Sequence, residues 1–212
     1  MTTADGSRAP RLPREQRREQ VLDAAREVFV ASGYHAASMD DIADRAGVSK
    51  PVLYQHFPGK LDLYVALLDT AIDDLLEAAK AALTGTSDNR LRVSAMTTVY
   101  FAFVEDPGGA FRLVFESDLA NEPAVRQRVD AADITLASRI ADVIAEDTGL
   151  SDEQALVLAS GLQGMTQVAA RRWLRDPAPD VSRSEAAELI TSLAWRGISG
   201  FPLSHPPQAN TA

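Results

Sequence analysis

Apolar residues recur at helical spacing along most of the chain, beginning at about Arg14. In the first such stretch the apolar face is formed by Val21, Leu22, Ala24, Ala25, Val28 and Phe29. Gly33 then predicts the end of this helix, because glycine readily adopts the backbone conformation that follows a helix C-terminus. Two short helices are expected next, over 39–46 and about 49–57, and a long one from residue 60 to about 83.

The same pattern continues after the polar stretch 84–89. Five more helices are expected, over 90–105, 110–118, 122–148, 151–175 and 183–200. Two of them begin with a capping-box signature, Ser151 with Gln154 and Ser182 with Glu185. Alternating β-branched runs and Asn-Gly hairpin turns are missing from the sequence. The predicted fold class is therefore all-α, with about nine helices.

Composition narrows the possible functions. The 212 residues are 46% apolar and 24% charged, which is typical of a globular chain with a substantial core. Cysteine is absent, which excludes disulfides and thiolate metal sites, and three histidines are too few for a His-rich metal site. We expect no cofactor and no metal. Since no segment is apolar enough to span a membrane and no secretory signal is visible, a cytoplasmic protein without a membrane partner is expected.

The net charge of −9 is distributed unevenly along the chain. Residues 1–60 hold nine Lys/Arg against eight Asp/Glu, a net of +1, whereas residues 61–212 hold twelve against twenty-two, a net of −10. A basic start on an acidic body is typical of a protein that contacts a polyanion at one end. Residues 1–12 are expected to be a flexible basic tail. That tail is either an arm that reaches DNA or a solvated extension.

Residues 38–60 are predicted to form a helix-turn-helix, in which two short helices cross at a tight turn. The small residue Ala43 falls at the expected crossing, and Gly47 falls at the turn, where a residue tolerant of positive φ is needed. The residues expected to face the core are Ile42, Ala46, Val48 and Leu53. The second helix would then present Lys50, Pro51, Val52, Tyr54, Gln55 and His56 outward. Hydrogen-bond donors and small apolar groups of this kind suit the major groove of DNA.

The segment from residue 14 to about residue 68 resembles the DNA-binding domain of the TetR family of transcriptional regulators. The third-helix pattern of the family, S-K-x-x-L-Y-x-H-F, is matched by Ser49-Lys50-Pro51-Val52-Leu53-Tyr54-Gln55-His56-Phe57. The second-helix pattern, T/S-x-x-x-I-A-x-x-A-G-V, is matched by the eleven residues from Ser38 to Val48. Many members have a small residue and then Thr or Ser where this chain has Pro51 and Val52. That difference removes a polar contact, so the operator sequence cannot be taken from relatives.

The resemblance implies which residues contact DNA. It implies phosphate contacts from Ser38, Tyr54, His56 and Lys60. It implies base or groove contacts from Lys50, Pro51, Val52 and Gln55, and Ser49 completes the expected DNA-binding set. The structural alternatives are that Tyr54 packs on the first helix and that Lys60 is a solvated residue. The implied partner is double-stranded DNA with a palindromic operator, bound by a homodimer.

Aromatic residues are concentrated on both sides of a break at Pro107-Gly108-Gly109. This cluster indicates either an apolar ligand cavity or a packed core. The residues expected to line a pocket are Met96, Tyr100, Phe103, Phe111, Phe115, Gln163 and Gln167. No group of acidic residues and histidines has metal-ligand spacing, and no catalytic set has a supporting motif. An enzyme is therefore not expected.

The last two predicted helices combine small residues with apolar anchors, a composition that lets helices approach closely. The expected dimer interface is formed by Leu156, Leu162, Trp173, Leu189, Leu193 and Trp195. The alternative is that these residues are buried within one chain.

These expectations divide the chain into three parts after the tail. A helix-turn-helix DNA-binding domain is predicted over 13–60, a helical ligand-binding and dimerisation domain over 61–203, and a flexible tail over 204–212. The predicted function is a homodimeric regulator, a repressor whose affinity for its operator changes with a small apolar effector. The alternatives are an activator, a regulator that needs a co-repressor, and a helical lipid-binding protein without DNA function.

Overall fold

The computed structural model describes residues 13–106, 119, 121–175 and 180–197. Within these ranges the chain is all-α, as predicted, and no strand occurs. The helices are α1 (Arg14–Ala36), α2 (Met39–Ala46), α3 (Lys50–His56), α4 (Lys60–Thr84), α5 (Asn89–Glu105), α7 (Pro123–Thr148), α8 (Asp152–Leu174) and α9 (Arg183–Arg196). The helix predicted over 110–118, the two tails, and the pocket candidates Phe111 and Phe115 lie outside the described residues.

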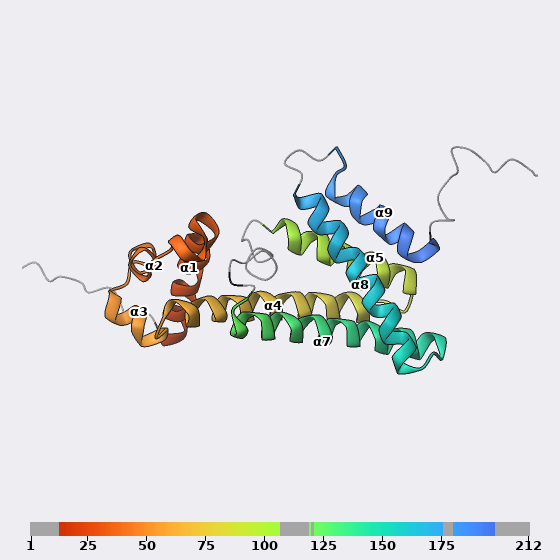
Figure 1. Ribbon diagram of the computed structural model, residues 1–212, viewed down its shortest axis with the longest axis horizontal. Coiled ribbons are helices and arrows are strands. Elements are labelled where there is room, and N and C mark those ends of the chain that lie inside the picture. The colour runs from red at the N-terminus through yellow and green to blue at the C-terminus, as the bar shows by residue number, and fades with distance from the viewer. Residues whose placement is uncertain (1–12, 107–118, 120, 176–179, 198–212) are drawn as a thin grey trace, which may run out of the picture.

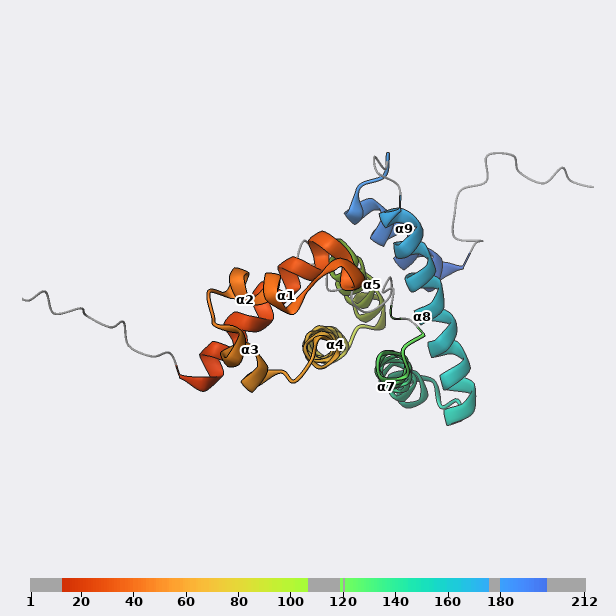
Figure 2. The same cartoon turned by 60° about the vertical axis from the view of Figure 1, so that its left-hand side comes forward.

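The helices form two groups joined by α4 (Figure 1). The first three helices lie together at one end of the molecule, and α4 runs from them along its length. Helix α7 lies alongside α4, and α5 packs against both α8 and α9 (Figures 1 and 2). Within the ranges described, no helix combines the length and the apolar composition needed to cross a bilayer.

Local signals set the helix ends. The capping boxes predicted at Ser151 and Ser182 are both formed, since each serine accepts from a backbone N–H three residues on, and the side chain there accepts from the serine's own N–H. A third capping box, between Ser38 and Asp41, starts α2. Gly33 has φ 75° inside α1, so the regular helix breaks at the predicted glycine and a short helical segment continues to Ala36.

The core of the first group extends into the second. Ile42, Leu53 and Leu68 are fully buried in a cluster formed mainly by the first four helices. Val125 of α7 is 1% exposed and belongs to the same cluster. Helices α4 and α7 therefore share one core with the helix-turn-helix.

Candidate nucleic-acid interface and candidate ligand cavity

A tight turn at Gly47 places α3 across α2. Gly47 has φ 62° and ψ 32°, in the left-handed region, and a Cβ there would meet nothing within 4 Å. The requirement for glycine is therefore conformational and not steric. Ala43 is 1% exposed, and its carbonyl oxygen accepts a 3.0 Å hydrogen bond from the Val48 N–H, which closes the turn. Both the predicted crossing and the predicted turn are confirmed.

One face of α3 is anchored in the core and the opposite face is open to solvent. Leu53 is completely buried, whereas Tyr54 is 47% exposed. The exposed members of the predicted DNA-binding set are Ser49, Lys50, Pro51, Tyr54 and Gln55, and Ser38, Val52, His56 and Lys60 are half-buried. Neither Tyr54 nor Gln55 makes a side-chain hydrogen bond within the part of the chain that the structure describes. Their polar groups are therefore available to an outside partner.

Lys50, the first residue of α3, has a partner on α2. Its Nζ lies 2.6 Å from Asp40 Oδ2, and both side chains are largely exposed. This hydrogen bond to the Asp40 carboxylate raises the pKa of Lys50 above its ordinary value. In the protein without DNA, the charge of Lys50 is thus compensated by Asp40.

Lys60, the first residue of α4, is occupied within the fold. Its Nζ donates hydrogen bonds of 2.8 Å to the carbonyl oxygens of Tyr34 and Ala37, and it lies 4.4 Å from the centre of the Tyr34 ring. The phosphate contact that the resemblance implies for Lys60 stays a prediction. The structure gives this side chain a role in holding α4 to the end of α1, which the sequence analysis did not foresee.

The N-terminal part of α1 adds basic side chains near the end of α3. The Arg18 guanidinium lies 5.0 Å from the centre of the ring of Phe57, the residue that follows α3. Gln20 donates a 2.8 Å hydrogen bond to the carbonyl oxygen of Ala46, at the end of α2. Arg18 and Gln20 therefore hold the N-terminal part of α1 against the helix-turn-helix.

A cavity of about 690 Å³ lies between α5, α7, α8 and α9, with Leu83 of α4 at its wall. Its volume is in the usual range for small-molecule sites. The aliphatic part of its wall is formed by Val93, Met96, Leu136, Ile140, Val143, Ile144, Leu158, Leu162 and Met165. Val157 and Trp195 also line it and are 72% and 47% exposed, so the cavity opens to solvent beside α8 and α9.

The structure separates the predicted pocket residues. Met96, Tyr100 and Gln163 line the cavity. Phe103 packs instead against two core clusters, because it follows the cavity-lining turn of α5 and faces the core beyond it. Gln167 is buried in a hydrogen-bond network behind the wall. Among the residues that the structure describes, the wall is mainly aliphatic, and Tyr100 and Trp195 are its aromatic members.

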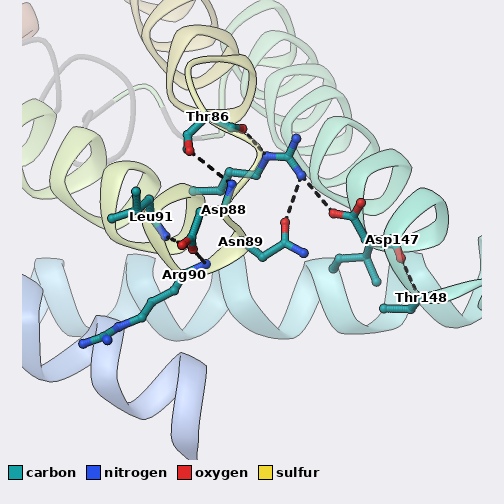
Figure 3. A network of polar contacts seen from close by, with 9 residues as sticks. Thr86, Asp88, Asn89, Arg90, Leu91, Asp147 and Thr148 are labelled. Carbon is teal, nitrogen blue, oxygen red and sulfur yellow. Dashed lines mark hydrogen bonds and ion pairs between the residues drawn. The ribbon is translucent and has the colours of Figure 1, made fainter.

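One part of the cavity wall is polar and is shown in Figure 3. Arg92 donates from Nη1 to Asp147 Oδ2 and to Asn89 Oδ1, each at 2.9 Å, and from Nε to the Thr86 carbonyl oxygen at 2.8 Å. The Arg92 and Asp147 side chains are only 19% and 33% exposed. This network joins the start of α5 to the end of α7. The sequence pattern does not indicate this network, because Arg92 and Asp147 are 55 positions apart.

A second polar group connects α7 to α8. Asp133 Oδ1 accepts hydrogen bonds of 2.8 Å from the side-chain amides of both Gln163 and Gln167. Arg171 donates to Gln167 Oε1 at 3.4 Å. Tyr100 of α5 lies beside this group, and burial raises the pKa of its hydroxyl far above the ordinary value.

Apolar side chains are exposed along α8 and α9, both at the rim of the cavity and outside it. Val168 is 64% exposed, and of the predicted interface residues Leu156, Leu189 and Trp195 are 43% to 49% exposed. Leu162 and Leu193 are half-buried and line the cavity. Trp173 packs inside the chain, since its ring centre lies 5.9 Å from that of Phe101 and its Nε1 donates to the Val181 carbonyl oxygen at 2.8 Å.

The α8 surface contains two glycines whose presence the single chain does not explain. Val157, Gly161, Gly164 and Val168 are spaced so that they follow one face of the helix. A Cβ at Gly161 or Gly164 would meet nothing within 4 Å, so no close contact within the chain requires glycine there. Over the ranges described, no group of three or more His, Asp or Glu residues is arranged to hold a metal ion.

An anchored recognition helix at one end and a cavity among the remaining helices define a helix-turn-helix DNA-binding protein with a ligand-sized site. The family described as "Bacterial regulatory proteins, tetR family" matches residues 21–67. The "HTH-type transcriptional activator FasR" of Mycolicibacterium smegmatis is 45% identical over 197 residues, which cover 93% of this chain and 90% of that protein. The chain therefore belongs to the TetR family of bacterial transcriptional regulators.

Solved structures agree with this assignment. A TetR-like transcriptional regulator from Rhodococcus sp. RHA1 is 28% identical, with a TM-score of 0.71 over 90% of this chain and 100% of that one. The regulator FadR from Bacillus subtilis, solved in complex with stearoyl-CoA, has a TM-score of 0.68 at 19% identity, over 85% of this chain and 98% of that one. The second similarity is one of fold.

Proposed function

We propose that this protein is a homodimeric regulator that binds a palindromic operator through α3 and responds to an apolar ligand in the cavity. Residues 13–60 would form the DNA-binding domain and residues 61–203 the ligand-binding and dimerisation domain. The observation that carries the proposal is the outward face of α3, which is anchored by buried Leu53 and presents Tyr54 and Gln55 to solvent. A helix held this rigidly and exposed on one side suits the major groove.

The residues of this face would make two kinds of contact with DNA, to base edges and to phosphates. Gln55, Val52 and Pro51 would meet base edges, with the apolar groups suited to the methyl group of thymine. Phosphates would be contacted by Ser38, Ser49, Tyr54, His56 and Lys60. For Lys50 we propose a phosphate contact in place of the base or groove contact that the resemblance implies, because its ammonium lies beside Asp40 at the start of α2. These contacts to the backbone fix the register of the protein on the duplex without carrying sequence information.

The exposed apolar surface of α8 and α9 supports the dimer. Glycine in a helix costs about 0.5–1 kcal/mol relative to alanine, so two glycines without a contact in their own chain favour close approach by another helix. Val157 and Val168 lie on the same face and are largely exposed. A second copy that packs on this surface would bury them and place two recognition helices on one operator.

The cavity supports an elongated apolar ligand. Its wall is mainly aliphatic, with polar groups at Arg92 and at Gln163. Bacillus subtilis FadR, which has this fold, is described in complex with stearoyl-CoA. We propose a ligand that combines an acyl-like chain with a polar group, and no catalytic role for the protein.

Helix α4 would couple ligand binding in the cavity to DNA binding. Lys60 at its start is bound to α1, and Leu83 near its end lines the cavity. A ligand that prefers one position of this helix changes the separation of the two recognition helices in the dimer. Couplings of this kind are typically about 1–3 kcal/mol, or about 5- to 150-fold in DNA affinity.

The direction of the response follows from the 45% identical relative, which is named a transcriptional activator. We propose that this protein activates transcription, whereas the sequence predicted a repressor. We also propose that it acts in the cytoplasm. A reporter gene placed behind the selected operator distinguishes the two, because deletion of an activator lowers its expression and deletion of a repressor raises it.

The test of DNA binding is selection of bound duplexes from genomic fragments, followed by titration at several salt concentrations. Gln55→Ala should lose about 1–3 kcal/mol of discrimination at one base pair of each half-site. Gln127→Ala is the matched control, since Gln127 is also exposed but lies on α7. Selection that recovers no common sequence, or equal effects of the two substitutions, would contradict the proposal.

A further inference from the structure

We propose that Gln163 recognises a polar group of the ligand. Its Oε1 accepts a hydrogen bond from a hydroxyl or an amide N–H, and the rest of the ligand in the cavity is apolar. This inference rests on the part of the proposed function that assigns a ligand to the cavity. It adds the chemical group that the ligand must carry and the residue that recognises it.

The orientation of the Gln163 amide is determined by Asp133. A carboxylate only accepts hydrogen bonds, so the nitrogen of the amide must face it, and Gln163 Nε2 lies 2.8 Å from Asp133 Oδ1. Gln167 Nε2 donates to the same oxygen at 2.8 Å, which holds Asp133 in place from a second direction. The alternative amide orientation would put two acceptors together, so the oxygen of Gln163 is turned away from Asp133.

The oxygen turned away in this manner is buried and has no donor among the described residues. A buried amide oxygen without a donor costs free energy, and a leucine or methionine of similar size would avoid that cost. Gln163 lines the cavity, so a molecule bound there lies against this side chain. The unused acceptor is thus explained by a donor that arrives with the ligand.

The surroundings restrict the donor to a neutral group. The wall around Gln163 is formed mainly by aliphatic side chains, and the Thr97 hydroxyl is already bonded to the Val93 carbonyl oxygen at 2.9 Å. A cationic donor such as an ammonium would have to leave water for this mainly aliphatic wall, which costs free energy. An anionic group would meet the Gln163 oxygen and, behind it, the acidic Asp133, both of which repel it. A hydroxyl or an amide N–H meets an acceptor of matching polarity.

The experiment compares dodecan-1-ol with its methyl ether, 1-methoxydodecane, which keeps the same chain and oxygen, gains one methyl group and cannot donate a hydrogen bond. Binding to the full chain is followed by tryptophan fluorescence, because Trp195 lines the cavity. The wild-type protein should prefer the alcohol roughly tenfold, the factor expected for one buried hydrogen bond. In Gln163→Met the preference should fall to about onefold, and the affinity for the ether should not decrease.

Gln127→Met is the control, because Gln127 is an exposed glutamine on α7 that neither lines the cavity nor contacts Asp133. It should keep the preference for the alcohol. Equal binding of the two probes by the wild-type protein overturns the inference, even if Gln163→Met fails to fold, and so does an unchanged preference in Gln163→Met. Binding of neither probe would overturn the ligand part of the proposed function as well, whereas equal binding leaves that part intact.

Discussion

The Lys60 ammonium donates a 2.8 Å hydrogen bond to the carbonyl oxygen of Tyr34 and lies 4.4 Å from the centre of the same residue's ring. The last carbonyl groups of a helix have no intrahelical donor, and here the first residue of α4 supplies one to the end of α1. The contact joins positions 26 residues apart. It connects the helix that reaches the cavity with the core of the DNA-binding end.

Lys60→Met should lower the free energy of unfolding by about 1–3 kcal/mol, because half-buried carbonyl groups lose a charged donor. Urea denaturation measures this change. Lys80→Met is the control, since Lys80 is an exposed lysine on the same helix with only a 3.5 Å contact to Glu77. Equal stabilities of the two variants would contradict a structural role for Lys60. If Lys60 also contacts a phosphate, the salt dependence of DNA binding should fall by about one unit.

Asp40→Asn should strengthen binding to every duplex, because it removes a negative charge beside the recognition helix and releases Lys50 for a phosphate. The slope of log affinity against log salt should become steeper by up to about one unit, which titrations at several salt concentrations measure. Asp74→Asn, an exposed aspartate on α4, should leave both quantities unchanged. Weaker DNA binding by Asp40→Asn would show that Lys50 needs its partner when bound.

Leu189→Glu should convert the dimer into monomers, since a charge placed in an apolar contact without a partner costs several kcal/mol, of the order of 3–5 kcal/mol. Leu189 is 49% exposed in the single chain, so its own fold should tolerate the change. Sedimentation at micromolar concentration gives the oligomeric state. Ile134→Glu is the matched control on α7, where the replaced side chain is 67% exposed. A wild-type monomer, or dissociation of both variants, would argue against the α8 and α9 surface.

Val143→Phe should reduce ligand binding by filling part of the cavity, of which Val143 forms part of the wall. Stearoyl-CoA serves as the probe, and its effect on the melting temperature should become smaller than in the wild-type protein. DNA affinity without the probe should stay the same, because α3 is not touched. Val181→Phe controls for added bulk at an exposed position away from the cavity. An undiminished shift in Val143→Phe would place the ligand elsewhere.

Glu185→Gln should make the stability of the protein less dependent on acid pH. Hydrogen bonds from the Ser182 hydroxyl and backbone N–H lower the pKa of Glu185 below its ordinary 4.5 in the folded state. The charge therefore stabilises the fold fully above about pH 4.5, and this contribution is lost as the pH falls through the lowered pKa. The wild-type protein should melt higher than Glu185→Gln at pH 7, and the two curves should converge below pH 4.5. A constant difference across this range would contradict the role of the charge.

The features that could be predicted from the sequence are those set by local chemistry. Helices follow from the spacing of apolar residues, and their ends follow from groups that act within a few positions, such as Gly47 at its left-handed turn and Ser151 with Gln154. The pattern around Leu53 also predicted which side of α3 faces the core. For these features the interacting atoms are neighbours in the chain, so the sequence pattern contains them.

Contacts between side chains that are distant in the chain could not be predicted in this way, because they depend on how the helices pack. The bond from Lys60 to Tyr34, the Arg92–Asp147 pair and the hydrogen bond from Gln163 to Asp133 join positions 26, 55 and 30 residues apart. Phe103 and Met96 lie on the same helix, α5, and the sequence suits both to a pocket. In the structure Phe103 packs against the core, and Met96 lines the cavity. The packing angles of α5, α7 and α8 determine that division, because they set how far along each helix the neighbouring side chains reach.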